Sequence, residues 1–444
     1  MLKLTILLTL FWLPSALLNL DSLDNFFAWR HQLIMYTGFL SLGYMSVAVL
    51  LAARFKWVEN WVQGLDKGYQ LHKSLGIGTL VSLTTHWLSV QGAKWLVGAG
   101  LLARPQRGGG QHRQALEGIP WRGIAEQVGE LAFYVFIIFA VISLIQAIGY
   151  RQFKFTHKIG GVLMIAGVFH SVILLDWNLG SMPMNIAIGA LSAIAVYCSY
   201  LSLTGKIGRN KKSSGQVTSK EVFSNNQGIE EVVRFSIQLE KPLNYKEGQF
   251  AYLDFQDGES AHPFSILNYD SSSNTMEFGV KALGDYTSTL INKIHQGQPV
   301  SVEGSYGHFQ IEAEDEQFWV GAGIGIVPFV SRLYWLRQLD KLTNKNSATP
   351  KKVHLFYCVN NKKDAYFEAE ILSTIKQLDF VELRTLYADE GELLSVETLL
   401  KYKDARSMHV SFCGPETFRE KLKSGLMRAG MPENQMHFES FKMR

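Results

Sequence analysis

Residues 72–86 read HKSLGIGTLVSLTTH and place two histidines 14 positions apart in a run of apolar and small polar residues. A second stretch, HKIGGVLMIAGVFH at residues 157–170, repeats the arrangement with a spacing of 13. At 3.6 residues per turn, either spacing is close to four helical turns, so the two histidines of each stretch lie near one helix face. They are then roughly 20 Å apart along the helix axis.

Six apolar segments in the first half of the chain suit membrane-spanning helices, which need about 20 residues each. They are residues 4–20, 33–53, 71–90, 128–148, 159–175 and 186–203. The third and fifth, which hold the histidine stretches, are marginal by hydropathy because they contain His, Ser and Thr. The first could instead be a signal peptide, but it shows no clean small-residue cleavage site, so an uncleaved span is preferred.

The composition divides the chain into two halves. Hydrophobic residues make up 47% of the 444 residues and charged residues only 18%, which excludes a disordered or collagen-like chain. Residues 1–215 carry 18 Lys and Arg against 8 Asp and Glu, whereas residues 216–444 carry 25 against 31. The basic residues lie between apolar runs, so no nucleic-acid partner is expected. Cys198, Cys358 and Cys413 form no C-x-x-C pair, which excludes a disulfide scaffold and c-type haem attachment.

The basic residues between the spans predict the orientation. With six spans, one side of the membrane receives both chain ends and most of the loop lysines and arginines. These are Arg54, Lys56, Lys67, Arg151, Lys154, Lys158, Lys206, Arg209, Lys211 and Lys212. The sequence therefore predicts a multi-pass protein of the plasma (inner) membrane whose second half is cytoplasmic.

One long loop on the opposite side, residues 91–125, does not follow this rule. It holds five basic residues against Glu117 alone: Lys94, Arg104, Arg107, Arg113 and Arg122. The loop could attract an anionic electron acceptor, or it could be an ordinary solvated segment.

The four histidines predict two haem sites at two depths. The third and fifth spans run in the same direction, so His72 and His157 are expected near the cytoplasmic side and His86 and His170 near the outer side. Two facing imidazoles can ligate a haem iron, and two such b-type haems form an electron path across the bilayer. A histidine inside a membrane can also simply bond a neighbouring helix, but four at matched depth favour ligation.

Other residues near these spans refine the haem prediction. Clearance for a macrocycle is expected at five glycines: Gly76, Gly78, Gly160, Gly161 and Gly167. A zinc site is disfavoured because each level offers only two nitrogens. His31 and His112 have no counterpart at the right depth and are expected at the surface.

The pattern changes after a polar linker at residues 206–216. Short alternating segments at 232–239, 250–255, 276–281 and 300–304 predict an antiparallel β-barrel over residues 217–313. From residue 314 to 444, strands at 318–320, 353–359, 381–387 and 408–412 alternate with helices ending near 339 and covering 365–378 and 416–429. This alternation predicts a parallel sheet with crossover helices.

An ordered set of residues in the barrel fits a flavin. Phe264, in the segment His262-Pro263-Phe264-Ser265, can lie against a flavin ring, and Ser265 can hydrogen-bond the ring or the ribitol. Lys281 and a helix start at Gly284-Asp285-Tyr286-Thr287 can hold a pyrophosphate through charge, backbone N–H groups and the helix dipole. Ordinary strand and turn positions are the alternative interpretation.

Two glycine-containing loops follow strands of the predicted parallel sheet. The first runs from Gly321 to Phe329 and contains Gly323, Gly325 and Pro328; the second is Cys413-Gly414-Pro415-Glu416. Glycines let the backbone approach a phosphate, and helix N-termini favour its negative charge. The first loop is G-x-G-x-G rather than G-x-G-x-x-G. Two such loops at strand ends predict a nucleotide-binding crevice at a topological switch point.

Taken in order, these motifs resemble the ferric reductase and NADPH oxidase superfamily over nearly the whole chain, in a compact bacterial form. The resemblance implies a transmembrane di-haem domain at residues 1–205, followed by a ferredoxin-reductase-like module: an FAD-binding barrel and an NAD(P)H-binding α/β domain. It also implies that Phe441, in the ending Phe438-Glu439-Ser440-Phe441, covers the flavin and that Cys413 lies near the site of hydride transfer. Lys362 and Lys363 could bind the 2′-phosphate of NADPH or form a solvated turn, with a slight preference for NADPH.

The resemblance implies an oxidoreductase that uses NAD(P)H, FAD and two haems to reduce an outer acceptor. Dioxygen giving superoxide is the first expectation, and a ferric chelate or other metal complex is the rival. A third hypothesis is a membrane subunit that passes electrons to a periplasmic acceptor protein. A haem or metal transporter is disfavoured because it needs no flavin domain. Candidate acceptor-binding residues are Arg30, His31 and Arg122.

Overall fold

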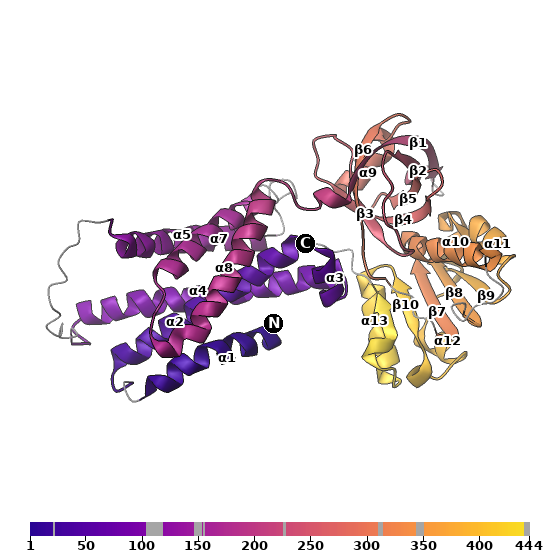
Figure 1. Cartoon of the computed structure of the whole chain (residues 1–444). Helices are drawn as coiled ribbons and strands as arrows, with labels where there is room; N and C mark the ends of the chain where they lie inside the picture. Colours follow the sequence, from indigo (N-terminus) through magenta and orange to yellow (C-terminus); the bar gives the residue numbers. More distant parts are fainter. Residues whose placement is uncertain are drawn as a thin grey trace. The chain divides into compact units, whose positions relative to one another are not determined.

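The computed structural model describes residues 1–20, 23–103, 119–145, 153, 156–224, 228–309, 314–342 and 350–438. The chain forms two compact units (Figure 1). The helical unit comprises residues 1–62 and 67–207, and the reductase unit comprises residues 63–66 and 208–444.

Helices occupy all six segments predicted as membrane spans. They are α1 (Leu2–Leu18), α2 (Phe26–Ala52), α4 (Leu65–Gly98), α5 (Trp121–Leu144), α7 (Ile159–Ile173) and α8 (Met182–Leu203), with the short α3 (Lys56–Val62) between α2 and α4. Three are long and apolar enough to cross a membrane: α2, α5 and the segment Leu179–Leu203 that contains α8. Helices α1 and α7 are apolar but shorter. The chain is therefore a membrane protein by its helices, while six spans and their orientation remain predictions.

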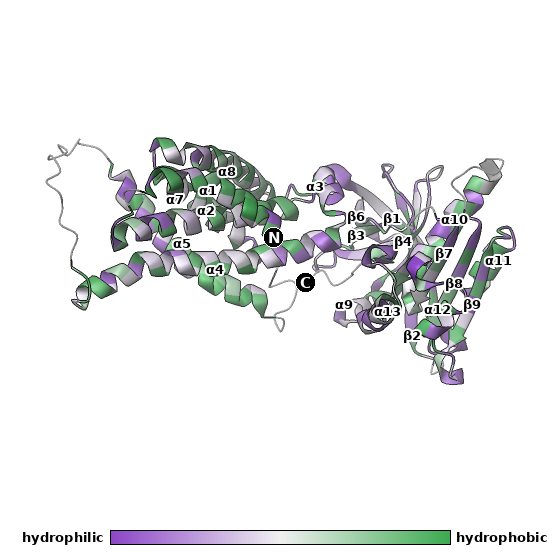
Figure 2. Cartoon of the chain, turned by 90° about the horizontal axis from the view of Figure 1, so that it is seen from below, coloured by the Kyte–Doolittle hydropathy of each residue, from purple (hydrophilic) through white to green (hydrophobic). Residues whose placement is uncertain are grey.

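Helix α4 has mixed polarity, which Figure 2 shows as alternating colours along its length. Its hydroxyl groups are nevertheless satisfied within the helix, since Thr79 and Ser82 donate to the carbonyl oxygens of Leu75 and Gly78 at 2.9 Å. Ser41 of α2 also donates to Ser82 at 2.8 Å and links the two helices. Such internal bonds let a polar helix tolerate an apolar environment.

The predicted outer loop 91–125 is shorter than expected. Helix α4 continues to Gly98 and α5 begins at Trp121, so Lys94 and Arg122 lie on helices. Arg104, Arg107, Arg113, Glu117 and His112 lie outside the described residues, as do Arg151 and Lys154 of the predicted cytoplasmic side.

The reductase unit begins with a closed antiparallel barrel in the strand order β1-β2-β5-β4-β3-β6. Its elements are β1 (Lys212–Ser224), β2 (Glu230–Leu239), β3 (Phe250–Asp254), β4 (His262–Asp270), β5 (Thr275–Lys281), α9 (Asp285–Lys293) and β6 (Pro299–Tyr306). Strand β1 starts inside the segment predicted as a linker. The strand shows no alternation of apolar and polar residues at its start. Its inward positions there are the small residues Ser213 and Gly215 instead of large apolar ones.

A five-stranded parallel sheet follows, in the order β11-β10-β7-β8-β9. Its strands are β7 (Glu316–Ala322), β8 (Lys352–Val359), β9 (Val381–Tyr387), β10 (Val410–Cys413) and β11 (Met436–Phe438), and its helices are α10 (Val327–Leu342), α11 (Glu368–Ile375), α12 (Val396–Leu400) and α13 (Glu416–Arg428). The predicted fold class is confirmed. Three-residue β11 was too short to predict from its pattern. The strand order reverses between β7 and β10, so the loops after these two strands flank a switch point.

Candidate functional site

The structure brings the four histidines together in two pairs, each with one imidazole from α4. His72 faces His157, with ring centres 5.8 Å apart and ring planes at 57°. His86 faces His170, with ring centres 6.2 Å apart and planes at 82°. Two metal–nitrogen bonds of about 2 Å each would place the centres of two ligating imidazoles roughly 6 Å apart. Both separations therefore suit one metal ion between two rings.

Hydrogen bonds orient three of the four rings for ligation. Nδ1 of His72 donates to the Ala48 carbonyl oxygen at 2.8 Å, Nδ1 of His86 to Ile34 at 3.0 Å, and Nδ1 of His170 to Ala125 at 2.8 Å. A carbonyl oxygen only accepts, so the proton lies on Nδ1 and the lone pair on Nε2. This tautomer, fixed by a second hydrogen bond, is the one that metal-ligating histidines use.

His157 is held differently. Its Nδ1 lies 3.3 Å from the Ser143 hydroxyl, and its ring stacks between Phe139 and Phe153, with ring centres 5.0 and 4.8 Å away. Across the described residues, no group of three or more His, Cys, Asp or Glu could hold a metal ion. The donor set at each level is two imidazoles, which fits haem iron with its four equatorial porphyrin nitrogens better than zinc.

Two glycines that the sequence did not single out make room for the outer pair. A Cβ at Gly129 would overlap the His170 ring, 2.8 Å from its Cγ, and a Cβ at Gly38 would lie 3.1 Å from Cε1 of His86. Each glycine comes four residues after the carbonyl that its histidine bonds, Ala125 or Ile34. No sequence signal marks which carbonyl a histidine of another helix will bond, so these two glycines could not have been found from the sequence.

The predicted glycines divide into two groups. A Cβ at Gly76 or Gly167 would meet no atom within 4 Å, so these two offer the expected clearance. A Cβ at Gly78, Gly160 or Gly161 would meet side chains of neighbouring helices. These three glycines serve helix packing.

Gly129→Ala tests the clearance at the outer pair. The new methyl group would displace the His170 ring from the Ala125 carbonyl, so we expect weakened ligation: a shifted or diminished low-spin signal for one haem of two, measured by electron paramagnetic resonance. Gly123→Ala, on the same helix and with no atom within 4 Å, is the control and should leave both signals unchanged. Identical spectra for the two variants would contradict the clearance role.

The three candidate acceptor residues lie in different surroundings. Arg30 of α2 donates to the carbonyl oxygens of Ser89 and Val90 on α4, at 2.7 and 3.2 Å, three and four residues beyond His86. His31 lies 3.9 Å from Asp176, and Arg122 forms an exposed ion pair with Glu126 at 3.2 Å. Of these three candidates, only Arg30 bonds helix α4 close to His86.

In the flavin motif, side chains alternate across β4. Phe264 is 8% exposed and belongs to the apolar core of the barrel, so it does not present a free ring face. His262, Pro263 and Ser265 are partly exposed, and the His262 ring stacks on Tyr286 with ring centres 4.0 Å apart. Burial, together with the nearby Asp257 carboxylate, raises the pKa of Tyr286 and keeps its hydroxyl protonated. The exposed part of the flavin motif is therefore formed by Pro263, Ser265 and the stacked pair.

The predicted pyrophosphate residues already have partners. Lys281 forms an ion pair with Glu231 of β2 at 3.1 Å. The Thr287 hydroxyl accepts from the backbone N–H groups of Leu283 and Gly284, both at 3.0 Å, and so caps the start of α9. Gly284, at the N-cap, is extended.

The two glycine loops of the parallel sheet pack against each other. A Cβ at Gly325 would overlap the Cys413 carbonyl, and Cβ atoms at Gly321 and Gly414 would lie 2.7 Å from Ile326 and Ala322. Gly323 differs: its φ is +56°, which favours glycine, and a Cβ there would meet nothing within 4 Å. Of the glycines in these two loops that were predicted to bind the nucleotide, Gly323 is the one with open space beside it.

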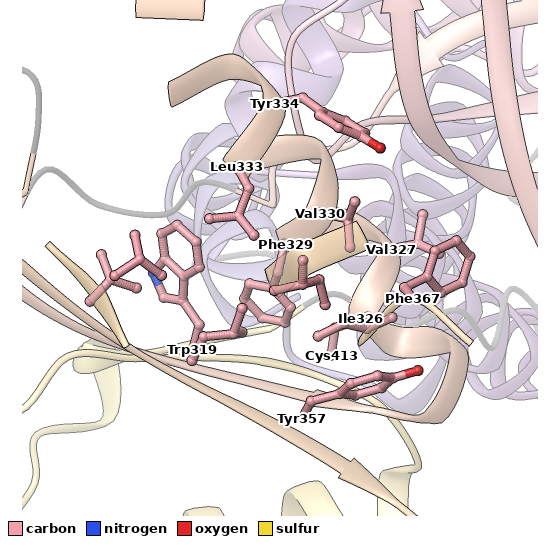
Figure 3. Packing of buried hydrophobic residues seen from close by; sticks show 14 of the residues in the cluster. Trp319, Ile326, Val327, Phe329, Val330, Leu333, Tyr334, Tyr357, Phe367 and Cys413 are labelled. Carbon is pink, nitrogen blue, oxygen red and sulfur yellow. The ribbon is translucent and has the colours of Figure 1, made fainter. Parts of the chain in front are cut away.

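The remaining predicted residues surround these loops. Cys413 is 2% exposed and lies beside Ile326 beneath the start of α10 (Figure 3). Pro328 is buried in the first turn of α10, where its missing N–H costs nothing, and Pro415 is the N-cap of α13. Lys362 and Lys363 are exposed in a 3-10 turn three residues beyond β8. Phe441 lies outside the described residues.

Two family models match the chain. Residues 37–168 match the ferric reductase like transmembrane component, and residues 217–316 match an FAD-binding domain. A transmembrane ferric-reductase-like domain joined to an FAD-binding domain is the architecture of the ferric reductase and NADPH oxidase superfamily. The resemblance seen in the motifs is thus confirmed, and the chain has the architecture of an oxidoreductase.

Individual relatives match parts of the chain. Ferric reduction oxidase 8, mitochondrial, from Arabidopsis thaliana is 27% identical over 207 residues, which cover 40% of this chain and 28% of that protein. The ferredoxin–NAD(P)(+) reductase component of the naphthalene 1,2-dioxygenase/salicylate 5-hydroxylase systems of a Ralstonia species is 22% identical over 237 residues, 51% of this chain and 69% of that protein. The structure of ferredoxin-NADP+ reductase from Plasmodium falciparum has a TM-score of 0.43 at 16% identity, covering 52% of this chain and 96% of that one.

Proposed function

We propose that the chain is a multi-pass membrane enzyme that moves electrons from NAD(P)H on the cytoplasmic side to an acceptor on the outer side. The observation that carries the proposal is the two imidazole pairs, each with one ring from α4, His72 facing His157 and His86 facing His170, with ring centres 5.8 and 6.2 Å apart. The FAD-binding barrel and the loops at the switch point of the parallel sheet support the donor half of the reaction.

The histidines would hold two b-type haems, the inner one between His72 and His157 and the outer one between His86 and His170. Bound FAD would supply the conversion of a nicotinamide electron pair into single electrons, and the haems would supply the one-electron path across the bilayer. Pro263 and Ser265 would border the flavin, and Gly323 with the start of α10 would receive a phosphate of the nucleotide. By family resemblance, Phe441 would cover the flavin, and Cys413 would lie near the hydride-transfer position.

The acceptor would react outside the iron coordination sphere, because two imidazoles would already hold each iron. We propose dioxygen as the acceptor and superoxide as the product, since this reaction needs one electron and no new ligand. The Arg30 guanidinium, held on the α4 carbonyls beyond His86, would place a positive charge where an anionic product or acceptor forms. Lys362 and Lys363 would favour NADPH by binding its 2′-phosphate.

A ferric chelate is the second candidate acceptor. It is favoured by the match of residues 37–168 to the ferric reductase like transmembrane component and by the name of the plant relative. A chelate reduced by one electron at the haem edge requires the same geometry, so only the acceptor distinguishes the two functions.

Cytochrome c reduction separates these acceptors. The purified protein, loaded with haem and FAD, is mixed with NADPH and cytochrome c in air, with and without superoxide dismutase. We expect the dismutase to abolish cytochrome c reduction, because superoxide is then the carrier. Reduction that resists the dismutase, together with NADPH-dependent formation of a ferrous chelate under argon, would support the metal reductase instead.

A further inference from the structure

Strand β5 is one of the places where the barrel meets the parallel-sheet domain, beside the contact of α10 with β4. A Cβ at Gly279 of β5 would lie 3.0 Å from the Phe367 ring and 3.4 Å from Val327, so the nucleotide-domain side chains reach the strand backbone here. Figure 3 shows Phe367 beside Val327, which is the first residue of α10 and follows the loop containing Gly323. One side of this apolar contact, Val327, therefore belongs to the segment proposed to bind the nucleotide, and the other, Phe367, precedes α11.

An arginine fork lies directly beside that apolar contact. Arg234 of β2 pairs with Gly279 in the strand register. Its Nη1 and Nη2 donate to the two carboxylate oxygens of Glu370 on α11, at 2.9 and 3.1 Å, and Nη2 also donates to Glu277 of β5 at 3.1 Å. The three side chains are 22–23% exposed. A two-point arginine–carboxylate bond in such a half-buried place fixes direction as well as distance.

A second ionic contact lies two residues along the same strand. Lys281 pairs with Glu231 at 3.1 Å, and the Tyr366 hydroxyl, from the nucleotide domain, donates to the same Glu231 carboxylate at 3.1 Å. Burial and the Glu231 charge raise the pKa of Tyr366, so this donor stays protonated. We call the six residues Glu231, Arg234, Glu277, Lys281, Tyr366 and Glu370 the interdomain clasp.

We propose that the interdomain clasp is a positioning element for hydride transfer, which fixes the angle between the FAD-binding barrel and the nucleotide domain. This inference rests on the proposed function. Apolar contact alone is non-directional and lets two surfaces slide. The paired hydrogen bonds of the clasp have a direction, and they flank the place where Gly279 of β5 meets Val327.

The distance dependence of hydride transfer explains why a fixed angle between the two domains matters. Hydride moves with its electron pair from the nicotinamide to the flavin only when the reacting atoms lie about 3–3.5 Å apart, and a 1 Å error can cost about 100-fold in rate. The two cofactors would be held by different domains, so their separation depends on the interdomain angle. By this assignment Lys281 acts in the clasp, while its role as a pyrophosphate ligand stays a prediction.

Glu370→Gln is the variant that separates positioning from folding. It weakens the bond between domains, while Arg234 keeps Glu277 inside the barrel and no charge is left without a partner. The two domains also keep a second polar contact, because Ser331 and Arg332 of α10 bond Tyr245 and Glu247 of the barrel. Arg234→Lys retains the charge but loses the fork, and should behave like Glu370→Gln.

The experiment measures flavin reduction in the full chain loaded with haem and FAD, mixed with NADPH without oxygen in a stopped-flow instrument. For Glu370→Gln we expect a limiting reduction rate about tenfold lower, a fraction of the 100-fold cost of a 1 Å error. The apparent Kd for NADPH should change less than threefold and the melting temperature by a few degrees at most. The isotope effect with 4-deuterated NADPH should rise, because hydride transfer becomes slower than the steps around it.

Glu316→Gln is the matched control. Its carboxylate is 29% exposed and bonds His354 and Lys403, all within the nucleotide domain, so the limiting rate should stay at the wild-type value. Equal limiting rates for Glu370→Gln and wild type would overturn the clasp proposal, and so would equal losses in Glu370→Gln and Glu316→Gln. Failure of NADPH or NADH to reduce the wild-type flavin would instead overturn the proposed function, and the clasp proposal with it.

Discussion

Replacing His170 with alanine is expected to remove one of two haems and stop electron delivery to the outer acceptor. The outer site then retains one imidazole, His86, and loses the ring that faces it at 6.2 Å. The inner pair, His72 and His157, is untouched, as is the reductase unit. Haem content per protein should therefore fall by half, acceptor reduction should fall to background, and NADPH should still reduce the flavin at the wild-type rate.

His31→Ala is the control for this experiment. His31 is also a histidine of the helical unit, but its neighbour is Asp176 at 3.9 Å rather than another imidazole. The His31→Ala variant should retain two haems per chain. If His170→Ala also retains two haems with unchanged optical and magnetic spectra, the ligand assignment at the outer level is wrong.

The paired histidines show what sequence periodicity can predict. A helix repeats every 3.6 residues, so spacings of 14 and 13 fix both the face and the depth of each imidazole on its own helix. Pairing His72 with His157 and His86 with His170 needed one further inference: the third and fifth spans run through the membrane in the same direction. Both properties are local or topological, and neither depends on side-chain packing.

Features that depend on neighbouring elements could not be predicted in this way. Gly38 and Gly129 lie on α2 and α5, and their role exists only because a histidine from another helix enters the space beside them. Lys281 suggests a phosphate ligand from its strand, but that strand alone does not reveal its ion pair with Glu231 of the neighbouring strand β2. Phe264 has the right position in its motif, yet the alternation of β4 turns its ring into the core.

The same distinction applies to the glycine loops. As a motif, Gly321, Gly323 and Gly325 suggest three positions that approach a phosphate. In the structure, only Gly323 combines open space with a left-handed backbone, whereas Gly321 and Gly325 are glycine because another backbone or side chain lies against them. The motif therefore combines one candidate ligand position with two packing positions.

Gly325→Ala is expected to cause the largest loss in the reductase unit. Its new methyl group would overlap the Cys413 carbonyl, with the carbonyl carbon at 2.7 Å and the Gly414 nitrogen at 3.0 Å. These are backbone atoms at the ends of two paired strands, since Cys413 lies opposite Gly321, and they cannot rotate aside. Overpacking of this kind costs about 1–3 kcal/mol. The two loops must separate, so we expect weaker nucleotide binding, with the Kd for NADPH raised at least tenfold and a lower melting temperature.

Gly391→Ala provides the comparison, because it changes a glycine of the same domain whose φ is +80° and whose Cβ would meet nothing within 4 Å. It should cost about 1 kcal/mol of backbone strain and leave NADPH affinity unchanged. Affinity is measured by flavin-reduction kinetics over a range of NADPH concentrations, and stability by thermal unfolding. A Gly325→Ala protein that binds NADPH like wild type would show that the packing of the two loops, although tight, does not shape the nucleotide site. The glycine at 325 would then serve stability alone, and the phosphate would have to be bound without a fixed second loop.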